Sequence, residues 1–159
     1  MPFLPLSLLI FLILTFLLLS DSYTIKFPLS LKNVGKSKSL HNSKLHEQLE
    51  VELDDRSYPI YIGKGLLESG EQLKKHIKSK KVLIVTNDKI APIYLNTIRE
   101  SLKNSGIEIF DVILPDGEIY KNMDILMKII DAAMINKLDR KSMFIALGGG
   151  VIGDMTGDF

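Results

Sequence analysis

The stretch that decides the fold is SMFIALGGGVIGD, residues 142–154, where an apolar run leads directly into three consecutive glycines. The apolar part is typical of a strand that is buried on both faces, as in a parallel sheet. Glycines after such a strand predict a loop into a helix, with backbone N–H groups that a phosphate can approach closely. Packing in a tight strand-to-helix turn is the alternative reason for the same glycines.

Working outward from this stretch, strand and helix patterns alternate along the chain. Apolar runs typical of buried strands occupy residues 81–88 and 107–115. Apolar residues at helical spacing occupy residues 91–106, which Gly106 should end, and residues 122–137. The order strand, helix, strand, helix, strand predicts an α/β fold, a Rossmann-like parallel sheet.

Two weaker patterns precede this alternation. Residues 48–65, QLEVELDDRSYPIYIGKG, alternate apolar and polar side chains on both sides of a polar turn, which predicts an N-terminal β-hairpin. Residues 66–79 have apolar side chains at near-helical spacing, with Gly70 weakening the pattern. We therefore expect a hairpin and a helix before the parallel sheet.

The first 46 residues have a different composition. Residues 1–20 are uncharged and mostly apolar, which is typical of a signal peptide or signal anchor. Residues 21–46 resemble a transit segment, since five lysines and no acidic residue lie between Ser22 and His46. Together they predict the two-part leader of a plastid protein. A secreted protein with a basic linker and a retained membrane anchor are the alternatives.

Charge and metal-ligand residues limit the function classes. The formal net charge of the chain is +1, so no nucleic-acid partner is expected, and a membrane would be met only through the leader. The chain has no cysteine, and its three histidines, His41, His46 and His76, have no partner at metal-ligand spacing. We expect no metal ligand in this chain.

Three polar or glycine-rich segments follow the predicted strands: TND at 86–88, PDGEIYK at 115–121 and GGGVIGD at 148–154. Ligands of parallel α/β sheets bind at the carboxyl ends of the strands, so these segments predict one binding site. Structural alternatives remain for two of them. The first segment could cap the next helix, and Glu118 with Lys121 could form a solvent-exposed ion pair.

Taken together, these segments resemble the N-terminal nucleotide domain of the 3-dehydroquinate synthase family. The resemblance extends from about Leu49 to Gly157. Iron-type alcohol and glycerol dehydrogenases have a similar glycine loop but usually lack the PDGEIYK stretch. The resemblance implies an incomplete NAD-binding domain at residues 47–159 and a role in the shikimate pathway of aromatic amino acid biosynthesis. The substrate would be a phosphorylated keto-acid sugar that loses phosphate as it cyclises.

The cofactor-binding residues implied by the resemblance lie on all three segments. They are Asn87, Asp116, Glu118, Lys121, Gly149, Gly150, Val151 and Asp154. The asparagine would contact the adenosine part of NAD, and the residues of 115–121 would line its ribose and nicotinamide side. Residues 149–151 would receive the pyrophosphate on their backbone, with the last aspartate beside the cofactor.

The resemblance also implies what lies elsewhere in the family. Its zinc ligands and substrate-binding residues lie further along, mostly in a helical C-terminal domain, so we expect this chain to be truncated before that domain. It should end in the first turn of the helix after the glycines, and TGDF at 156–159 departs from the family's G-[FY]-A-A. We expect no catalytic residue in this fragment, no activity of the chain alone, and a homodimer at full length.

Three other functions remain open at this point. Another sugar-phosphate cyclase would share the same NAD-binding segments. An iron- or zinc-type polyol dehydrogenase would share the glycine loop, although PDGEIYK argues against it. A membrane-anchored nucleotide-binding module without catalysis would need residues 1–20 to be retained.

Overall fold

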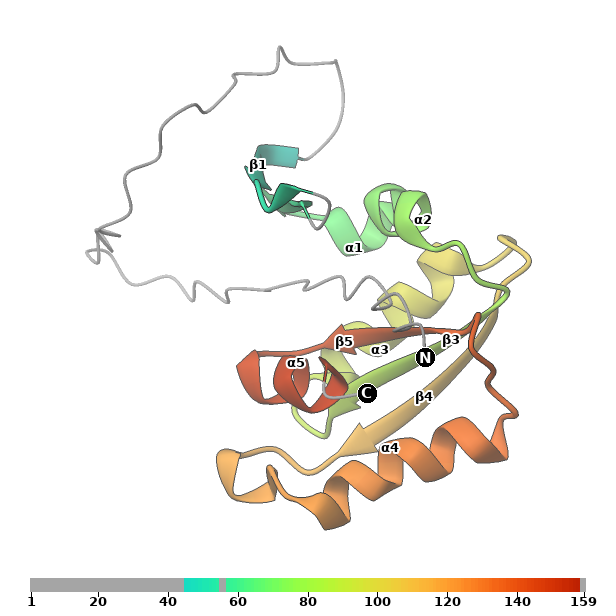
Figure 1. Cartoon of the computed structure of the whole chain (residues 1–159). Helices are drawn as coiled ribbons and strands as arrows, with labels where there is room; N and C mark the ends of the chain where they lie inside the picture. Colours follow the sequence, from blue (N-terminus) through green and yellow to red (C-terminus); the bar gives the residue numbers. More distant parts are fainter. Residues whose placement is uncertain (1–44, 55–56, 158–159) are drawn as a thin grey trace. The chain divides into compact units, whose positions relative to one another are not determined.

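The computed structural model describes residues 45–54 and 57–157 (Figure 1). The described residues fall into two compact units with the boundary between Lys64 and Gly65, and each is described by itself. The predicted signal segment 1–20 and nearly all of the transit-like segment 21–46 lie outside the described residues. Within the described part, no helix is long and apolar enough to span a membrane.

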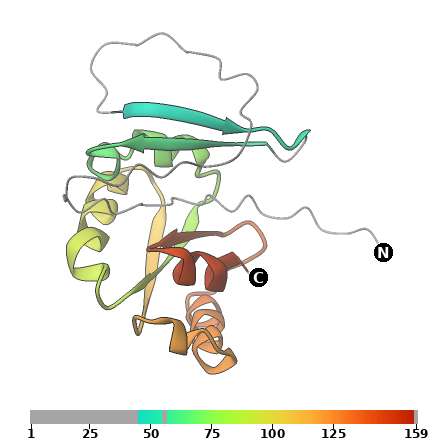
Figure 2. The same cartoon turned by 90° about the vertical axis from the view of Figure 1, so that its left-hand side faces the viewer.

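The first unit contains the predicted β-hairpin, which Figure 2 shows as two antiparallel ribbons. Strand β1, Leu45–Val51, pairs with strand β2, Tyr58–Gly63. In the connection between them, the Ser57 hydroxyl accepts from the Leu53 N–H at 2.9 Å and donates to the Asp54 carbonyl at 2.8 Å. The apolar alternation in residues 48–65 therefore predicted this hairpin correctly.

The second unit is built on a three-stranded parallel sheet. Its strands are β3, Lys81–Asn87, β4, Glu108–Leu114, and β5, Met143–Leu147, in the order β4-β3-β5. The central strand is buried at every residue from Val82 to Asn87, because it has a neighbour on each side and helices over both faces. The predicted α/β parallel sheet is confirmed.

Five helices cover the two faces of this sheet. They are α1, Leu66–Ser69; α2, Glu71–His76; α3, Ala91–Leu102; α4, Met123–Ile135; and α5, Gly150–Gly157. Helices α1, α2 and α3 pack with Val82 and Ile84 on one face. Helices α4 and α5 pack with Leu83 and Val85 on the other. The alternation along β3 thus separates two hydrophobic cores.

Two of the expected helices end or break elsewhere than predicted. Residues 66–79 form two short helices, because Gly70 has φ 61° and ends α1 in a left-handed conformation before α2 begins. Helix α3 ends at Leu102 and not at Gly106, since Lys103 already leaves the helical conformation with φ −56° and ψ 141°. Helical spacing alone does not locate either of these changes in backbone conformation.

The predicted helix after the glycines is present, but it is longer than expected. The chain was expected to end within the first turn of this helix, but α5 runs for eight residues. The reason is that α5 begins at Gly150, inside the glycine run, and the Gly153 N–H already donates to the Gly149 carbonyl at 3.0 Å. Two of its side chains, Ile152 and Met155, are buried against the sheet.

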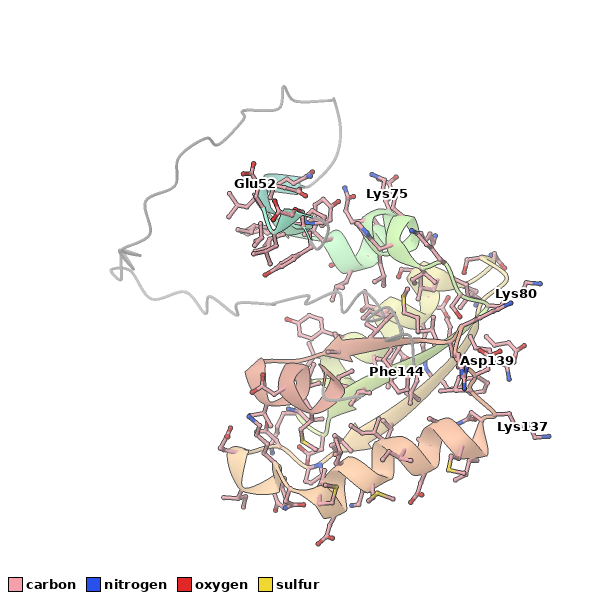
Figure 3. All side chains as sticks on the ribbon, viewed as in Figure 1. Glu52, Lys75, Lys80, Lys137, Asp139 and Phe144 are labelled. Atoms are coloured by element: carbon pink, nitrogen blue, oxygen red, sulfur yellow. The ribbon has the colours of Figure 1, made fainter. Side chains whose placement is uncertain are left out.

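Charged side chains lie near the amino ends of the strands, among them Lys80, Lys137 and Asp139 in Figure 3. The turn before β5 is held by Asp139, whose carboxylate accepts from the Ser142 hydroxyl and from the Lys141 N–H, each at 2.9 Å. These hydrogen bonds, the Ser142 bond foremost, hold the pKa of Asp139 below its usual range.

Thr86 on the central strand gives a prediction about stability. It is completely buried, and its hydroxyl has no hydrogen-bond partner among the described residues. Because an unpaired buried hydroxyl is costly, Thr86→Val should raise the free energy of unfolding by about 1 kcal/mol. Thr156→Val is the matched control, since that buried hydroxyl donates to the Ile152 carbonyl at 2.6 Å and its loss should not stabilise. Urea unfolding of both variants checks this, and equal effects would contradict it.

Candidate functional site

The carboxyl ends of the three parallel strands bring the predicted segments to one edge of the sheet. The strands run toward the side where α5 and the connection from β4 to α4 lie (Figure 1). They end almost level, because Asn87 is the register partner of Leu114 and Thr86 that of Leu147. The segments 115–121 and 148–154 therefore begin beside the end of β3, as the sequence predicted.

The first polar link at this edge joins β3 to the segment after β4. The Asn87 side chain donates from Nδ2 to Oδ1 of Asp116 at 2.7 Å. Its oxygen accepts from the N–H groups of Lys89 and Ile90 at 3.2 and 2.9 Å, just before α3. The Asn87 side chain thus bonds two backbone N–H groups ahead of α3, but the helix itself has no side-chain cap, so the predicted capping role is not seen.

A second link joins the segment after β4 to helix α5. Lys121 Nζ lies 2.7 Å from Asp154 Oδ2, and both side chains are partly exposed. Lys121 directly follows η2, a short 3₁₀ helix at Glu118–Tyr120, and its N–H donates to the Glu118 carbonyl at 3.0 Å. Glu118 and Lys121 thus lie at the two ends of a single turn, with the lysine paired to α5.

The three glycines differ in what a side chain would meet. A Cβ atom on Gly148 would lie 2.9 Å from Ile152 Cγ1, so packing explains this glycine. A Cβ atom on Gly149 or Gly150 would meet nothing within 4 Å, and neither residue has a positive φ. The packing alternative therefore accounts for the first glycine and leaves the other two unexplained. Open space at a helix N-terminus suits an anionic group.

The remaining predicted residues, Val151 and Glu118, differ in their burial and their position in the fold. Val151 is half-buried and packs against the core beneath α5. Glu118 is exposed on the turn after β4. Sequence reasoning did not foresee the exposed apolar side chains of Ile119 and Met123, 80% and 67% exposed, that flank Lys121. Their signal was available, since both are apolar residues inside an otherwise polar segment.

Metal-binding geometry is not found at this edge. Within residues 45–54 and 57–157, no group of three or more His, Asp or Glu side chains is arranged to hold a metal ion. The acidic side chains of Asp116 and Asp154 are instead paired with Asn87 and Lys121. We assign no metal-binding role to these residues.

Comparison with solved structures shows which known fold the chain shares. The crystal structure of 2-deoxy-scyllo-inosose synthase complexed with carbaglucose-6-phosphate, NAD+ and Co2+ superposes with a TM-score of 0.60. The match covers 69% of this chain and 30% of that one, at 17% identity. The chain therefore shares the α/β fold of the matched part of that structure.

Sequence comparison then shows which proteins the chain is similar to. Residues 111–159 match the family described as 3-dehydroquinate synthase N-terminal. The chain is 56% identical over 111 residues to the chloroplastic 3-dehydroquinate synthase of Arabidopsis thaliana, and 54% identical over 109 residues to the 3-dehydroquinate synthase of Hydrogenovibrio crunogenus. The chloroplastic protein of Solanum lycopersicum is 49% identical over 128 residues. Over this part of its length the chain is similar to 3-dehydroquinate synthases.

The matched region is a limited part of those relatives. It covers 69% of this chain but 25% of the Arabidopsis protein and 30% of the Hydrogenovibrio protein. The chain therefore spans less than a third of the length of the curated relatives it matches. The predicted resemblance is confirmed, and the roles of the individual site residues stay predictions.

Proposed function

We propose that this chain is the NAD-binding part of a 3-dehydroquinate synthase. The observation that carries the proposal is the open space at Gly149 and Gly150, where neither packing nor a positive φ requires glycine. That space lies at the N-terminus of α5, where a pyrophosphate would receive backbone N–H donors and the favourable end of the helix dipole. The relatives at 49–56% identity support 3-dehydroquinate synthase as the enzyme.

The surrounding side chains fit the rest of a dinucleotide. The Asp116 and Glu118 carboxylates are exposed on the segment after β4 and can accept from ribose hydroxyls. Lys121, partly exposed and paired with Asp154, places a cation near the negative pyrophosphate. Bound NAD+ would supply a transient hydride acceptor for a ring hydroxyl of the substrate. The described residues would bind and orient it.

For the complete enzyme we propose a lyase reaction. It would convert 3-deoxy-D-arabino-heptulosonate 7-phosphate to 3-dehydroquinate with elimination of phosphate. We expect a divalent metal, with zinc as the proposal, and a homodimer. No described residue group is arranged to hold that metal, so we derive no step through it. The chain alone should release no phosphate from the substrate when NAD+ and zinc are supplied, and phosphate release in a colorimetric assay would contradict this.

We also propose plastid targeting through the leader. Two of the plant relatives are chloroplastic by name, and the leader composition at residues 1–46 agrees with an organelle address. Fusion of residues 1–46 to a fluorescent protein should direct it to plastids. Retention of the fusion in the secretory pathway or in a membrane fraction would contradict this.

Calorimetric titration of the whole chain tests the nucleotide proposal. NAD+ and ADP-ribose share the pyrophosphate and should both bind saturably, whereas adenosine should bind at least about tenfold more weakly, because it lacks the anionic group that the helix N-terminus favours. Equal affinity for adenosine and ADP-ribose would contradict the proposal. Absence of binding by both NAD+ and ADP-ribose would also contradict it.

The similar fold of 2-deoxy-scyllo-inosose synthase favours one second candidate, another sugar-phosphate cyclase. Its identity of 17% is far below the 49–56% of the 3-dehydroquinate synthases. Substrate trials on the complete protein separate the two, since only one of them turns over a heptulosonate phosphate.

A further inference from the structure

We infer that Asn87 is a positioning residue: it sets the place of the Asp116 carboxylate and does not itself contact the nucleotide. The inference rests on the proposed function. It differs from the direct contact with the adenosine part of NAD that the family resemblance implies for Asn87.

The hydrogen-bonding capacity of Asn87 is nearly used up within the protein. An asparagine side chain can accept two hydrogen bonds at its oxygen and donate two from its nitrogen. Here the oxygen accepts from the backbone N–H groups of Lys89 and Ile90, which fixes the orientation of the amide. The nitrogen then faces Asp116 and donates to its Oδ1 at 2.7 Å. Three of the four hydrogen bonds are therefore made inside the protein.

The difference in burial between Asn87 and Asp116 also favours a positioning role for Asn87. Asn87 is 7% exposed, whereas Asp116 is exposed. A ligand at the strand ends can therefore reach the carboxylate far more easily than the buried amide. The Asp88 N–H also donates to the Leu114 carbonyl at 2.9 Å, so the backbone pairing of β3 and β4 continues up to the point where the two side chains meet. The Asn87 amide therefore holds the Asp116 carboxylate next to the paired ends of β3 and β4.

Exchanging the two side chains provides the test. Asn87→Asp keeps the acceptor for the two N–H groups but sets two carboxylates against each other at neutral pH. Asp116→Asn keeps a side-chain pair but removes the carboxylate. The double variant carrying both changes restores a donor and an acceptor in reversed order. Thermal unfolding and NAD+ affinity are measured for the whole chain and for all three variants.

The expected pattern separates positioning from contact. Asn87→Asp should lower the unfolding temperature and weaken NAD+ binding by about tenfold or more, since a charge-assisted hydrogen bond becomes a repulsion. The double variant should regain the wild-type unfolding temperature. Its NAD+ affinity should equal that of Asp116→Asn alone, because Asn87 would act only through residue 116.

Two results would overturn the inference. One is a double variant that unfolds at the temperature expected from adding the two single effects, which would mean that the side chains are not coupled. The other is a double variant that binds NAD+ more weakly than Asp116→Asn by the full factor of Asn87→Asp, which would mean direct contact. Absence of NAD+ binding to the wild-type chain would contradict the proposed function, and the unfolding temperatures would then decide whether Asn87 and Asp116 are coupled.

Discussion

Replacing both Gly149 and Gly150 with alanine should leave the chain folded and weaken NAD+ binding by about a hundredfold, because added methyl groups keep the pyrophosphate away from the backbone N–H donors. The fold should tolerate the change, since a Cβ atom at either position meets nothing within 4 Å. Alanine at Gly150, the first residue of α5, should even favour the helix slightly. Calorimetric titration with NAD+ and a thermal melt of the same sample measure both effects.

Gly148→Ala is the matched control from the same glycine run. Its Cβ atom would lie 2.9 Å from Ile152 Cγ1 and 3.0 Å from Ile152 Cβ, so this variant should lose stability. The double-alanine variant should therefore lose NAD+ affinity and keep its stability, whereas Gly148→Ala should lose stability. An unchanged NAD+ affinity in the double-alanine variant would remove the main support for the nucleotide site.

Gly70→Ala should cause the largest loss of stability, about 3 kcal/mol, from the cost of a left-handed alanine together with overpacking. Gly70 has φ 61° and is buried between α1 and α2. Its added Cβ would lie 2.8 Å from both Cβ and Oγ of Ser101 on α3. Ser101 cannot easily move away, because its hydroxyl donates to the Ile98 carbonyl at 2.9 Å and the residue is buried. The unfolding temperature should fall by about 12–24 °C.

Gly106→Ala isolates the backbone part of this loss. Gly106 has φ 70°, close to that of Gly70, but a Cβ atom there meets nothing within 4 Å. It should cost only the left-handed strain, about 1–2 kcal/mol. Circular dichroism melts of the two variants give the difference that belongs to the contact with Ser101. Equal losses would show that the close approach of Gly70 to α3 is relieved without cost.

The fold could be predicted from the sequence because its main signals are local. Residues 82–85 on the central strand are all apolar and completely buried, so a continuous apolar run was enough to predict a strand covered on both faces. The hairpin was equally visible from alternation. The break at Gly70 was not, because helical spacing does not show that this glycine takes a left-handed φ of 61° and ends α1.

The site was predicted at the level of segments and not of contacts. Its three segments could be predicted because each follows the end of a predicted strand. The contact between Lys121 and Asp154 could not, since these residues are separated by 33 positions and meet across the end of β3. A rule based on residue spacing does not predict a contact between residues so far apart in the sequence. The glycines make the same point differently, because Gly148, Gly149 and Gly150 are identical in the sequence and only the position of Ile152 separates packing from open space.

The level register of the three strands has a consequence for which insertions the protein can accept. A residue inserted within β4 would shift the segment 115–121 by about 3.3 Å along the strand and reverse the face of every side chain beyond it. A residue inserted in the turn 103–107, at the opposite edge, would leave the pairing of Asn87 with Leu114 unchanged. Length variation among natural or engineered versions of this chain should therefore collect in the turns that precede the strands.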